Sequence, residues 1–177
     1  MTFQELLAEH GRALQCEQGQ YLFRQGDDNR ALYLLKGGLL KAYYLSADGK
    51  ENIKSFLVPG DTIGSLKGVF SESGCSFNLV CLEQSELVRI DFDIVYSHSR
   101  DNLALAREML DFLLKFAMKK ETREFELLCL PPEERYRRLL ETTPRLFDQV
   151  TQNDIARYLG VTPVGLSRIK KRVQGTG

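Results

Sequence analysis

The most constraining feature of this sequence is a pair of capped helix signals close to its C-terminal end. Thr151 is a residue type that caps a helix start, and Asp154, three residues later, completes the pattern of a capping box. Gly160 is suited to ending a helix because it enters the left-handed backbone region without a steric cost. Thr162 followed by Pro163 then signals a new helix start. The stretch therefore predicts two helices joined by a short turn.

Both predicted helices have one apolar face. The apolar positions recur at helical spacing and are Ile155, Ala156, Leu159, Leu166, Ile169 and Val173. The opposite face of the second helix is basic, with Arg168, Lys170, Lys171 and Arg172. Two helices joined by a glycine-containing turn, the second of them basic, have the geometry that lays a recognition helix in the DNA major groove. The alternative is a helical hairpin that only packs within the protein, since basic faces are often simply solvated.

The charge of the chain is local rather than general. Its 177 residues include 24 lysines and arginines against 24 aspartates and glutamates, so the whole molecule is neutral. Basic residues outnumber acidic ones in residues 131–177, which places any attraction to nucleic acid at that end. No run approaches the roughly 20 apolar residues that span a bilayer, and the N-terminus lacks a signal-peptide pattern. The sequence therefore predicts a cytoplasmic protein with no membrane partner.

The N-terminal half has the sequence pattern of a β-domain. Residues 14–91 consist of short apolar or alternating runs separated by glycine, which is typical of a β-sandwich or a small barrel. Asp48 and Gly49 lie between two such runs and form the clearest hairpin signal. A short amphipathic helix is expected before the strands, over residues 3–9.

A single long helix is predicted over residues 101–130, where glycine and proline are absent. Two apolar stripes run along it: one is Leu103, Ala106, Leu110, Leu113 and Ala117, and the other is Leu105, Met109, Phe112 and Phe116. Together they form a wider apolar arc than one β-domain covers, so we expect this helix to pair with its copy in a homodimer. The alternative is that both stripes pack within one subunit.

Pro131 and Pro132 end the long helix and mark a domain boundary. The expected chain is α+β and has three parts. Residues 1–100 form the β-domain, residues 101–130 the connecting and dimerisation helix, and residues 131–177 the helix-turn-helix domain.

The chain lacks the groupings of side chains that enzymes use. There is no nucleophile paired with a base, no phosphate-binding loop and no paired acid and base, and Asp91 and Asp93 are better explained as caps of the following helix. The four cysteines form no C-x-x-C pair, and His10 and His98 are not spaced with them as zinc ligands are. We therefore predict a binding protein without a structural metal, and not an enzyme.

The order of these parts resembles the CRP/FNR family, named for the cyclic-AMP receptor protein and the fumarate-nitrate regulator. The motifs that carry the resemblance are Tyr21-Leu-Phe-Arg-Gln-Gly-Asp27, Leu32-Tyr-Leu-Leu-Lys-Gly37, Val58-Pro-Gly-Asp61 followed by Ile63-Gly64, Glu134-Arg-Tyr136, Ile155-Ala156, and Leu166-Ser-Arg-Ile169. They are spread over nearly the whole chain.

The resemblance implies a cyclic-nucleotide-binding-like β jelly roll, a homodimer built on the long helix, and a winged-helix-type reader of palindromic double-stranded DNA. Because the chain stops soon after the second helix of the pair, we expect the wing to be reduced or absent. RNA polymerase is a further partner that the resemblance brings into consideration.

The resemblance also locates an effector pocket, whose residues are altered here. The matching positions are Ile63, Gly64, Ser65, Leu66, Cys75, Ser76 and Phe77. In family members that bind a cyclic nucleotide, a glutamate meets the ribose and an arginine meets the cyclic phosphate, whereas this chain has Ser65 and Cys75 at those positions. Without the arginine the phosphate has no charge-assisted partner, so cyclic AMP is not expected to bind in the usual mode.

Other cofactors have no support in the sequence. The fumarate-nitrate branch holds an iron–sulfur cluster with several closely spaced N-terminal cysteines, whereas only Cys16 lies in that region here. No haem-ligand pattern stands out, so the effector or cofactor is left unknown. Cys75 is interpreted as a buried structural cysteine and not as a thiol sensor, because no positive charge lies beside it in the sequence.

The family pattern assigns the DNA-contacting residues. Where the family has Arg-Glu at the start of the recognition helix, this chain has Pro163 and Val164, while Arg168 matches the family's later arginine. We expect Val164 to contact a thymine methyl group and Arg168 to bind guanine through two hydrogen bonds. Thr151, Gln152 and Thr162 match positions that hold phosphates. The full predicted set is Thr151, Gln152, Thr162, Pro163, Val164, Gly165, Ser167, Arg168 and Lys171.

The predicted function is that of a homodimeric transcription regulator that reads an inverted repeat in DNA. The alternative is a cyclic-nucleotide-binding-like regulatory module whose helical end contacts another protein.

Overall fold

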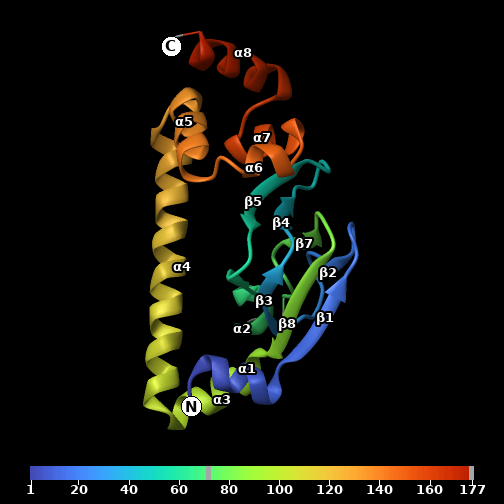
Figure 1. Cartoon of the computed structure of the whole chain (residues 1–177), viewed down its shortest axis with the longest axis vertical. Helices are drawn as coiled ribbons and strands as arrows, with labels where there is room; N and C mark the ends of the chain where they lie inside the picture. Colours follow the sequence, from blue (N-terminus) through green and yellow to red (C-terminus); the bar gives the residue numbers. More distant parts are fainter. Residues whose placement is uncertain (71–72, 176–177) are drawn as a thin grey trace.

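The computed structural model describes residues 1–70 and 73–175 of the chain (Figure 1). In chain order its elements are α1 (Phe3–His10), β1 (Arg12–Cys16), β2 (Tyr21–Phe23), β3 (Ala31–Gly37), β4 (Leu40–Leu45), β5 (Glu51–Leu57), β6 (Thr62–Ile63), α2 (Leu66–Phe70), β7 (Asn78–Cys81), β8 (Ser85–Asp91), α3 (Phe92–Asp101), α4 (Leu103–Cys129), α5 (Pro132–Thr142), α6 (Leu146–Gln149), α7 (Gln152–Leu159) and α8 (Pro163–Gln174). All these strands precede the long helix α4, and α5 to α8 follow it. This order confirms the predicted α+β class with a β jelly roll, a long helix and a terminal helix pair.

The β-domain is built from two four-stranded antiparallel sheets. One has the strand order β1-β8-β3-β6 and the other has the order β2-β7-β4-β5. Neighbouring strands are mostly not consecutive in the chain, which is the crossed connectivity of a jelly roll. Asp48 and Gly49 form the predicted hairpin between β4 and β5, where Gly49 has a φ of 80°. Within the described residues, β8 is the last strand, so no wing strand follows α8 as far as Gly175.

Aromatic side chains fill the space between the two sheets. The rings of Phe23 and Phe77 meet edge to face with centroids 5.1 Å apart, and the Tyr44 ring also meets Phe77 edge to face, at 6.3 Å. Phe77 is only 2% exposed and packs with Tyr33, Leu35 and the other core residues. The interior of the jelly roll is therefore occupied by the protein's own side chains.

Helix α4 runs beside the β-domain from the end that holds α1 and α3 to the end that holds α5 (Figure 1). It begins after Asn102, whose side-chain oxygen accepts from the Leu105 N–H at 3.1 Å. Its bounds agree with the predicted long helix, although residue 101 belongs to α3. Among the described residues, no helix combines enough length with enough apolar character to cross a bilayer.

The two predicted stripes of α4 have different surroundings. Leu105 is fully buried and Met109, Phe112 and Phe116 are partly buried, so this stripe faces the β-domain. Most of the other stripe, including Leu110, lies exposed. The single chain therefore covers only one of the two apolar stripes, contrary to the alternative in which both pack within one subunit.

The C-terminal helices share a hydrophobic core with the β-domain. Leu39 lies between β3 and β4, and it is 1% exposed because it packs among Tyr136, Leu139, Ile155 and other residues of the helices. Phe56 of β5 and Leu82 border the same cluster. The helical end of the chain is thus docked on the β4–β5 edge of the β-domain.

An ion cluster completes this docking. The Lys41 ammonium group of β4 lies 3.3 Å from the Asp154 carboxylate of α7 and 3.4 Å from the Glu51 carboxylate of β5. Arg157 of α7 lies 2.8 Å from the same Glu51 carboxylate. The side chains of Lys41 and Asp154 are only 12% and 9% exposed, so this pair is largely withdrawn from water.

Two predicted helix caps are wrong in detail. Asp154 supplies its backbone N–H to Thr151 as expected, but its carboxylate pairs with Lys41 and does not return to the Thr151 backbone as a capping box requires. Asp91 stands at the N-cap position of α3, yet its side chain makes no capping bond and pairs with Arg89 at 2.6 Å. In both cases the carboxylate pairs with an arginine or lysine and not with a backbone amide, because an ion pair adds the attraction of two opposite full charges.

We predict that Lys41→Met destabilises the protein by about 3 kcal/mol, since it removes the nearer cation from the nearly buried Asp154 carboxylate and leaves it only Arg157, 3.8 Å away. Urea unfolding of the full chain measures this change. The matched control is Arg30→Met, which breaks the Arg30–Asp93 pair, whose side chains are 45% and 65% exposed. An exposed pair contributes less than about 1 kcal/mol. Equal losses for the two variants would contradict the buried character of the docking cluster.

Candidate functional site

The helix pair near the C-terminus is built by the capping residues that the sequence predicts. The Thr151 hydroxyl accepts from the Asp154 N–H at 3.1 Å and starts α7. Gly160 ends it with a φ of 70° and a ψ of 31°, in the left-handed region. The Thr162 hydroxyl then accepts from the Gly165 N–H at 3.0 Å and starts α8. The short turn between these caps sets the angle between the two helices.

Helix α8 buries one face and exposes the other. Leu166 and Ile169 are buried and join the helical core, and α8 packs against α5 and α7. Figure 1 shows α8 at the end of the molecule opposite α1 and α3, beyond α7 and away from the strands. We call the outward surface formed by Thr162, Val164, Arg168 and Lys171 the recognition face. Val164 alone is 63% exposed on it.

The structure places most of the predicted DNA-contacting residues at the surface of this helix pair. The exposed ones are Thr151, Gln152, Thr162, Pro163, Val164, Ser167, Arg168 and Lys171, whereas Gly165 is partly buried. Gln152 lies beside α8, because its side-chain oxygen accepts a hydrogen bond from Lys170. The sequence-based assignment of these residues to DNA binding stays a prediction. All of them lie on the same pair of helices, α7 and α8, or at the start of one of them.

The basic residues of α8 differ in their partners. Lys170 donates to Gln152 and Arg172 pairs with Glu133 of α5, so both help to hold α8 on its neighbours. Arg168 and Lys171 form no ion pair with any residue in the described part of the chain. These two cations of the recognition face are therefore directed to solvent.

The residues predicted for an effector pocket lie mainly in the β-domain core. Ile63, Ser65, Cys75 and Phe77 are buried, and Gly64, Leu66 and Ser76 are partly buried. The Ser65 hydroxyl accepts from two backbone N–H groups, that of Gly68 at 3.2 Å and that of Ser76 at 3.1 Å. These amides are therefore already satisfied by a side chain of the protein. A pocket at these residues stays a prediction.

The Cys75 thiol is in a setting that disfavours its ionised form. Cys75 is buried, its sulfur lies 3.7 Å from the Asn29 carbonyl oxygen, and burial raises the pKa of the thiol above its usual value. This environment suits the structural role that the sequence predicts.

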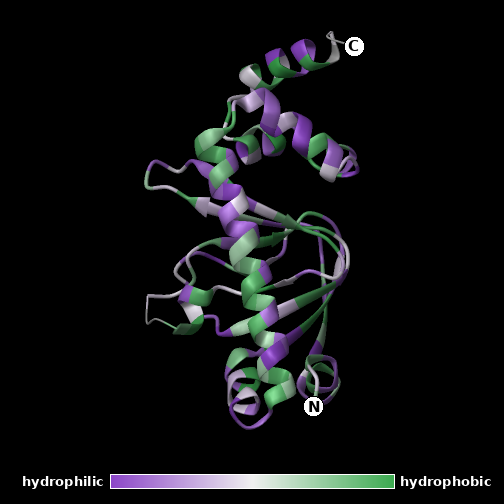
Figure 2. Cartoon of the chain, turned by 90° about the vertical axis from the view of Figure 1, so that its left-hand side faces the viewer, coloured by the Kyte–Doolittle hydropathy of each residue, from purple (hydrophilic) through white to green (hydrophobic). Residues whose placement is uncertain are grey.

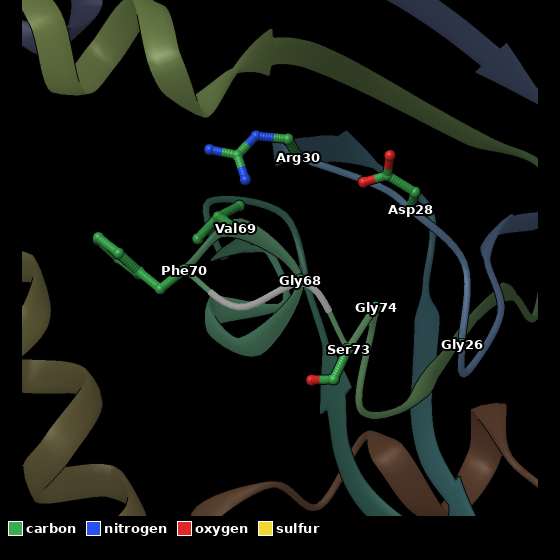
Figure 3. Close-up of a pocket in the computed structure, with 8 residues that line it drawn as sticks. All are labelled: Gly26, Asp28, Arg30, Gly68, Val69, Phe70, Ser73 and Gly74. Carbon is green, nitrogen blue, oxygen red and sulfur yellow. The ribbon is translucent and has the colours of Figure 1, made fainter.

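One cavity opens beside α2 (Figure 3). It has a volume of about 640 Å³ and is lined by Gly26, Asp28, Arg30, Gly68, Val69, Phe70, Ser73 and Gly74. Figure 3 shows Phe70 pointing away from Asp28 and Gly74. Arg30 holds both carboxylate oxygens of Asp93 at 3.1 and 2.8 Å, so its charge is already paired. We assign no chemistry to this cavity.

A second hollow, which we call the lysine cleft, lies between the β5–β6 region and α4. It measures about 600 Å³, and its cationic residues include Lys54, Lys120 and Arg123. Sequence reasoning missed it, because these residues come from elements far apart in the chain. The one available signal was Lys54 itself, a charged residue next to the buried Ile53 in β5.

The chain is similar to known regulators over most of its length. The family model of the cyclic nucleotide-binding domain matches residues 13–98. The fumarate and nitrate reduction regulatory protein of Salmonella typhi is 30% identical over 173 residues, which cover 91% of this chain and 68% of that protein. The anaerobic regulatory protein of Pasteurella multocida is also 30% identical over 173 residues, and the chain spans 62% of its length.

A solved structure supports the same fold. FixK2 from Bradyrhizobium japonicum superimposes with a TM-score of 0.80 at 18% identity, over 93% of this chain and 86% of that one. At this level of identity the similarity concerns the arrangement of the jelly roll, the long helix and the terminal helices.

We predict that Gly160→Ala destabilises the protein by about 1 kcal/mol, because the alanine Cβ lies too close to the backbone carbonyl oxygen in the left-handed region. An added Cβ would lie 3.6 Å from Leu127, an ordinary contact, so the backbone causes the loss. Gly37→Ala is the matched control, since Gly37 has no left-handed φ and its added Cβ also makes ordinary contacts, at 3.8 Å. Chemical denaturation should show a change within about 0.5 kcal/mol for the control. A Gly160→Ala variant as stable as the parent would mean that the turn is relaxed.

Proposed function

This chain belongs to the CRP/FNR family of transcription regulators, and on that premise we propose that it binds double-stranded DNA as a homodimer, at an inverted-repeat operator. In this proposal α8 is the recognition helix and α4 is the dimerisation helix. The observation that carries it is the exposed recognition face on a helix whose opposite side is fully used for packing.

The recognition face has the chemistry needed to read DNA. Arg168 and Lys171 are exposed cations one helical turn apart, and Val164 precedes Arg168 by one further turn on the same side. In the proposed complex the Arg168 guanidinium donates two hydrogen bonds to a guanine, and Val164 contacts a thymine methyl group. Thr151, Gln152 and Thr162 lie at helix starts, where hydroxyl, amide and backbone N–H groups meet phosphates.

The exposed side of α4 supports the homodimer. Its large apolar side chains recur about every one or two turns, and they are Leu103, Leu110, Leu113, Leu114, Met118, Phe125 and Leu128. Leu110, Leu114 and Met118 are 56%, 54% and 65% exposed in the single chain. Figure 2 turns α4 toward the viewer and shows hydrophobic segments along its length. Pairing of two such helices buries these side chains at a two-fold axis.

Two-fold symmetry determines the form of the operator. A dimer built on α4 carries two copies of α8 related by the dimer axis. Two recognition helices that enter successive major grooves on one side of the duplex are about 34 Å apart, one turn of DNA. The base sequence that they read is then an inverted repeat.

We further propose that cyclic AMP in the family's usual mode is not the effector. Three features support this: Phe77 fills the jelly-roll interior, Ser65 and Cys75 replace the charged residues, and the amides near Ser65 are already bonded to its hydroxyl. A phosphate bound there would lack the arginine that offsets its desolvation.

We expect Arg168→Ala to lose about 1–3 kcal/mol of specific DNA binding, because one bidentate contact to guanine disappears. The operator is first obtained by selection from random-sequence duplexes, and affinities are then measured by fluorescence anisotropy at constant salt. The variant should also accept any base at one position of each half-site.

Arg100→Ala is the control for this substitution. It removes the same charge from an exposed position on α3, at the opposite end of the molecule, and should leave affinity unchanged. An equal loss of affinity for operator and random DNA in Arg168→Ala would assign Arg168 to phosphate contacts only. Failure to select any sequence would favour the alternative function, a module that acts through protein contacts.

The combined change Leu110→Glu and Leu114→Glu is expected to convert the dimer to a monomer, because it places carboxylates at the centre of the apolar stripe. Sedimentation velocity gives the oligomeric state directly. Leu45→Glu is the matched control, since Leu45 is an exposed leucine, 44% accessible, on the β4–β5 hairpin. A dimer that survives the double change would place the dimer contact elsewhere.

A further inference from the structure

A hydrogen bond between Lys170 and Gln152 joins the two helices of the terminal pair. Gln152 is the first residue of α7, and Lys170 lies in the middle of α8. The Lys170 ammonium group donates to the side-chain oxygen of Gln152 across 18 positions of the chain. Gln152 belongs to the residues that the sequence assigns to DNA, whereas Lys170 does not. The structure therefore adds a contact that the sequence did not predict.

This hydrogen bond determines which way the Gln152 amide faces. An ammonium group has only N–H donors, so it bonds to the oxygen of a side-chain amide and not to its nitrogen. The NH2 group of Gln152 is therefore turned away from Lys170. Gln152 is exposed, and its NH2 group makes no hydrogen bond within residues 1–70 and 73–175. An oriented amide thus presents its N–H donors to solvent beside a cation.

The charge of Lys170 is not neutralised within the described part of the protein. Lys170 forms no ion pair there. The acidic residue in the first turn of α7 is Asp154, whose side chain is only 9% exposed. Its carboxylate lies 3.3 Å from Lys41 and 3.8 Å from Arg157, so it belongs to the docking cluster. The ammonium group beside Gln152 is therefore available to an anion from outside the chain.

Lys170 lies at the edge of the recognition face. Successive residues of a helix are about 100° apart around its axis. Lys170 is therefore placed between the buried Ile169 and Lys171, which belongs to the recognition face. In a helix-turn-helix the second helix enters the major groove while the first crosses the DNA backbone. A group on the α7 side of α8 accordingly faces the phosphates that border the groove and not the base edges.

We propose that Lys170 is a positioning residue that orients the Gln152 amide, and that the two side chains together clamp one phosphate of the DNA backbone. In the complex the Gln152 NH2 group donates to a phosphate oxygen, and Lys170 supplies the charge and a further N–H donor. The contact carries no sequence information, because every nucleotide has the same phosphate. The clamp rests on the proposed DNA binding and adds to it a residue outside the predicted set.

The first test measures affinity for the selected operator and for a random duplex by fluorescence anisotropy at several salt concentrations. Lys170→Met should weaken both duplexes equally, by about tenfold. It should also lower the slope of log K against log salt by about 1 for each half-site, because one cation no longer meets a phosphate. Gln152→Ala should weaken both duplexes by a smaller factor and leave the slope unchanged, because it removes no charge.

A double-mutant cycle tests the positioning role. If Lys170 orients Gln152, the double variant Lys170→Met with Gln152→Ala should bind within about twofold of Lys170→Met alone. Lys171→Met is the matched control, since it removes a cation of the recognition face that forms no hydrogen bond with Gln152 in the described residues. Its loss and that of Gln152→Ala should multiply, as for independent contacts. Lys170→Arg keeps a cation with N–H donors and should retain most of the affinity.

The free protein provides a second readout that needs no DNA. The side-chain amide of Gln152 should show restricted motion in ¹⁵N relaxation of the parent chain, because its oxygen is held by Lys170. The same amide should become mobile in Lys170→Met and stay ordered in Lys171→Met. Thermal melting of each variant shows that it is folded, so a loss of order at Gln152 is local.

The outcomes separate the clamp from DNA binding itself. A parent chain that binds no duplex overturns both the proposed function and the clamp. A parent that binds DNA, with Lys170→Met binding equally well, overturns the clamp alone. So does a loss in Lys170→Met that is confined to the operator, because it places Lys170 on a base. Losses of Lys170→Met and Gln152→Ala that multiply, or a Gln152 amide equally mobile with and without Lys170, overturn the positioning role.

Discussion

The docking of α7 onto strand β5 is the contact on which the direction of the C-terminal helices depends. Lys41 and Glu51 of the β-domain meet Asp154 and Arg157 of α7 in a cluster of two cations and two carboxylates, while Leu39 enters the helical core beside it. One side of α7 is thus held by the sheet and another packs against α8. Because the turn between α7 and α8 is short and capped, fixing α7 also fixes α8. The recognition face is directed away from the β-domain as a result.

Helix α4 changes its chemistry along the side that faces the β-domain. Near α1 and α3 this side is apolar, and Leu105 and Met109 anchor the helix in a core shared with those helices. Beyond Phe116 the same side becomes cationic, with Lys120 and Arg123 bordering the cleft. The first half of α4 is therefore attached by hydrophobic burial, which needs no partner molecule. The second half borders the charged residues of the lysine cleft.

The sequence predicts the parts of this molecule that depend on neighbouring residues. Thr151, Gly160 and Thr162 can be recognised as caps because each acts within one helical turn. The Asp154 carboxylate could not be placed in this way, because its partner Lys41 lies 113 residues away and only the fold brings them together. The same holds for the cleft, whose lysines are spread over β5 and α4. Phe77 is a further case: the family pattern assigns it to a pocket, and its place in the hydrophobic core follows only from the folded β-domain.

The contrast between Lys41 and Lys54 shows how the surroundings of a partly buried lysine decide what it contributes to the fold. Both project from strands of the same sheet into partly desolvated surroundings beside the helical end of the chain. Lys41 meets two carboxylates, so its burial is compensated within the protein. Lys54 meets Lys120 and two aromatic rings, so its charged form is compensated only in part.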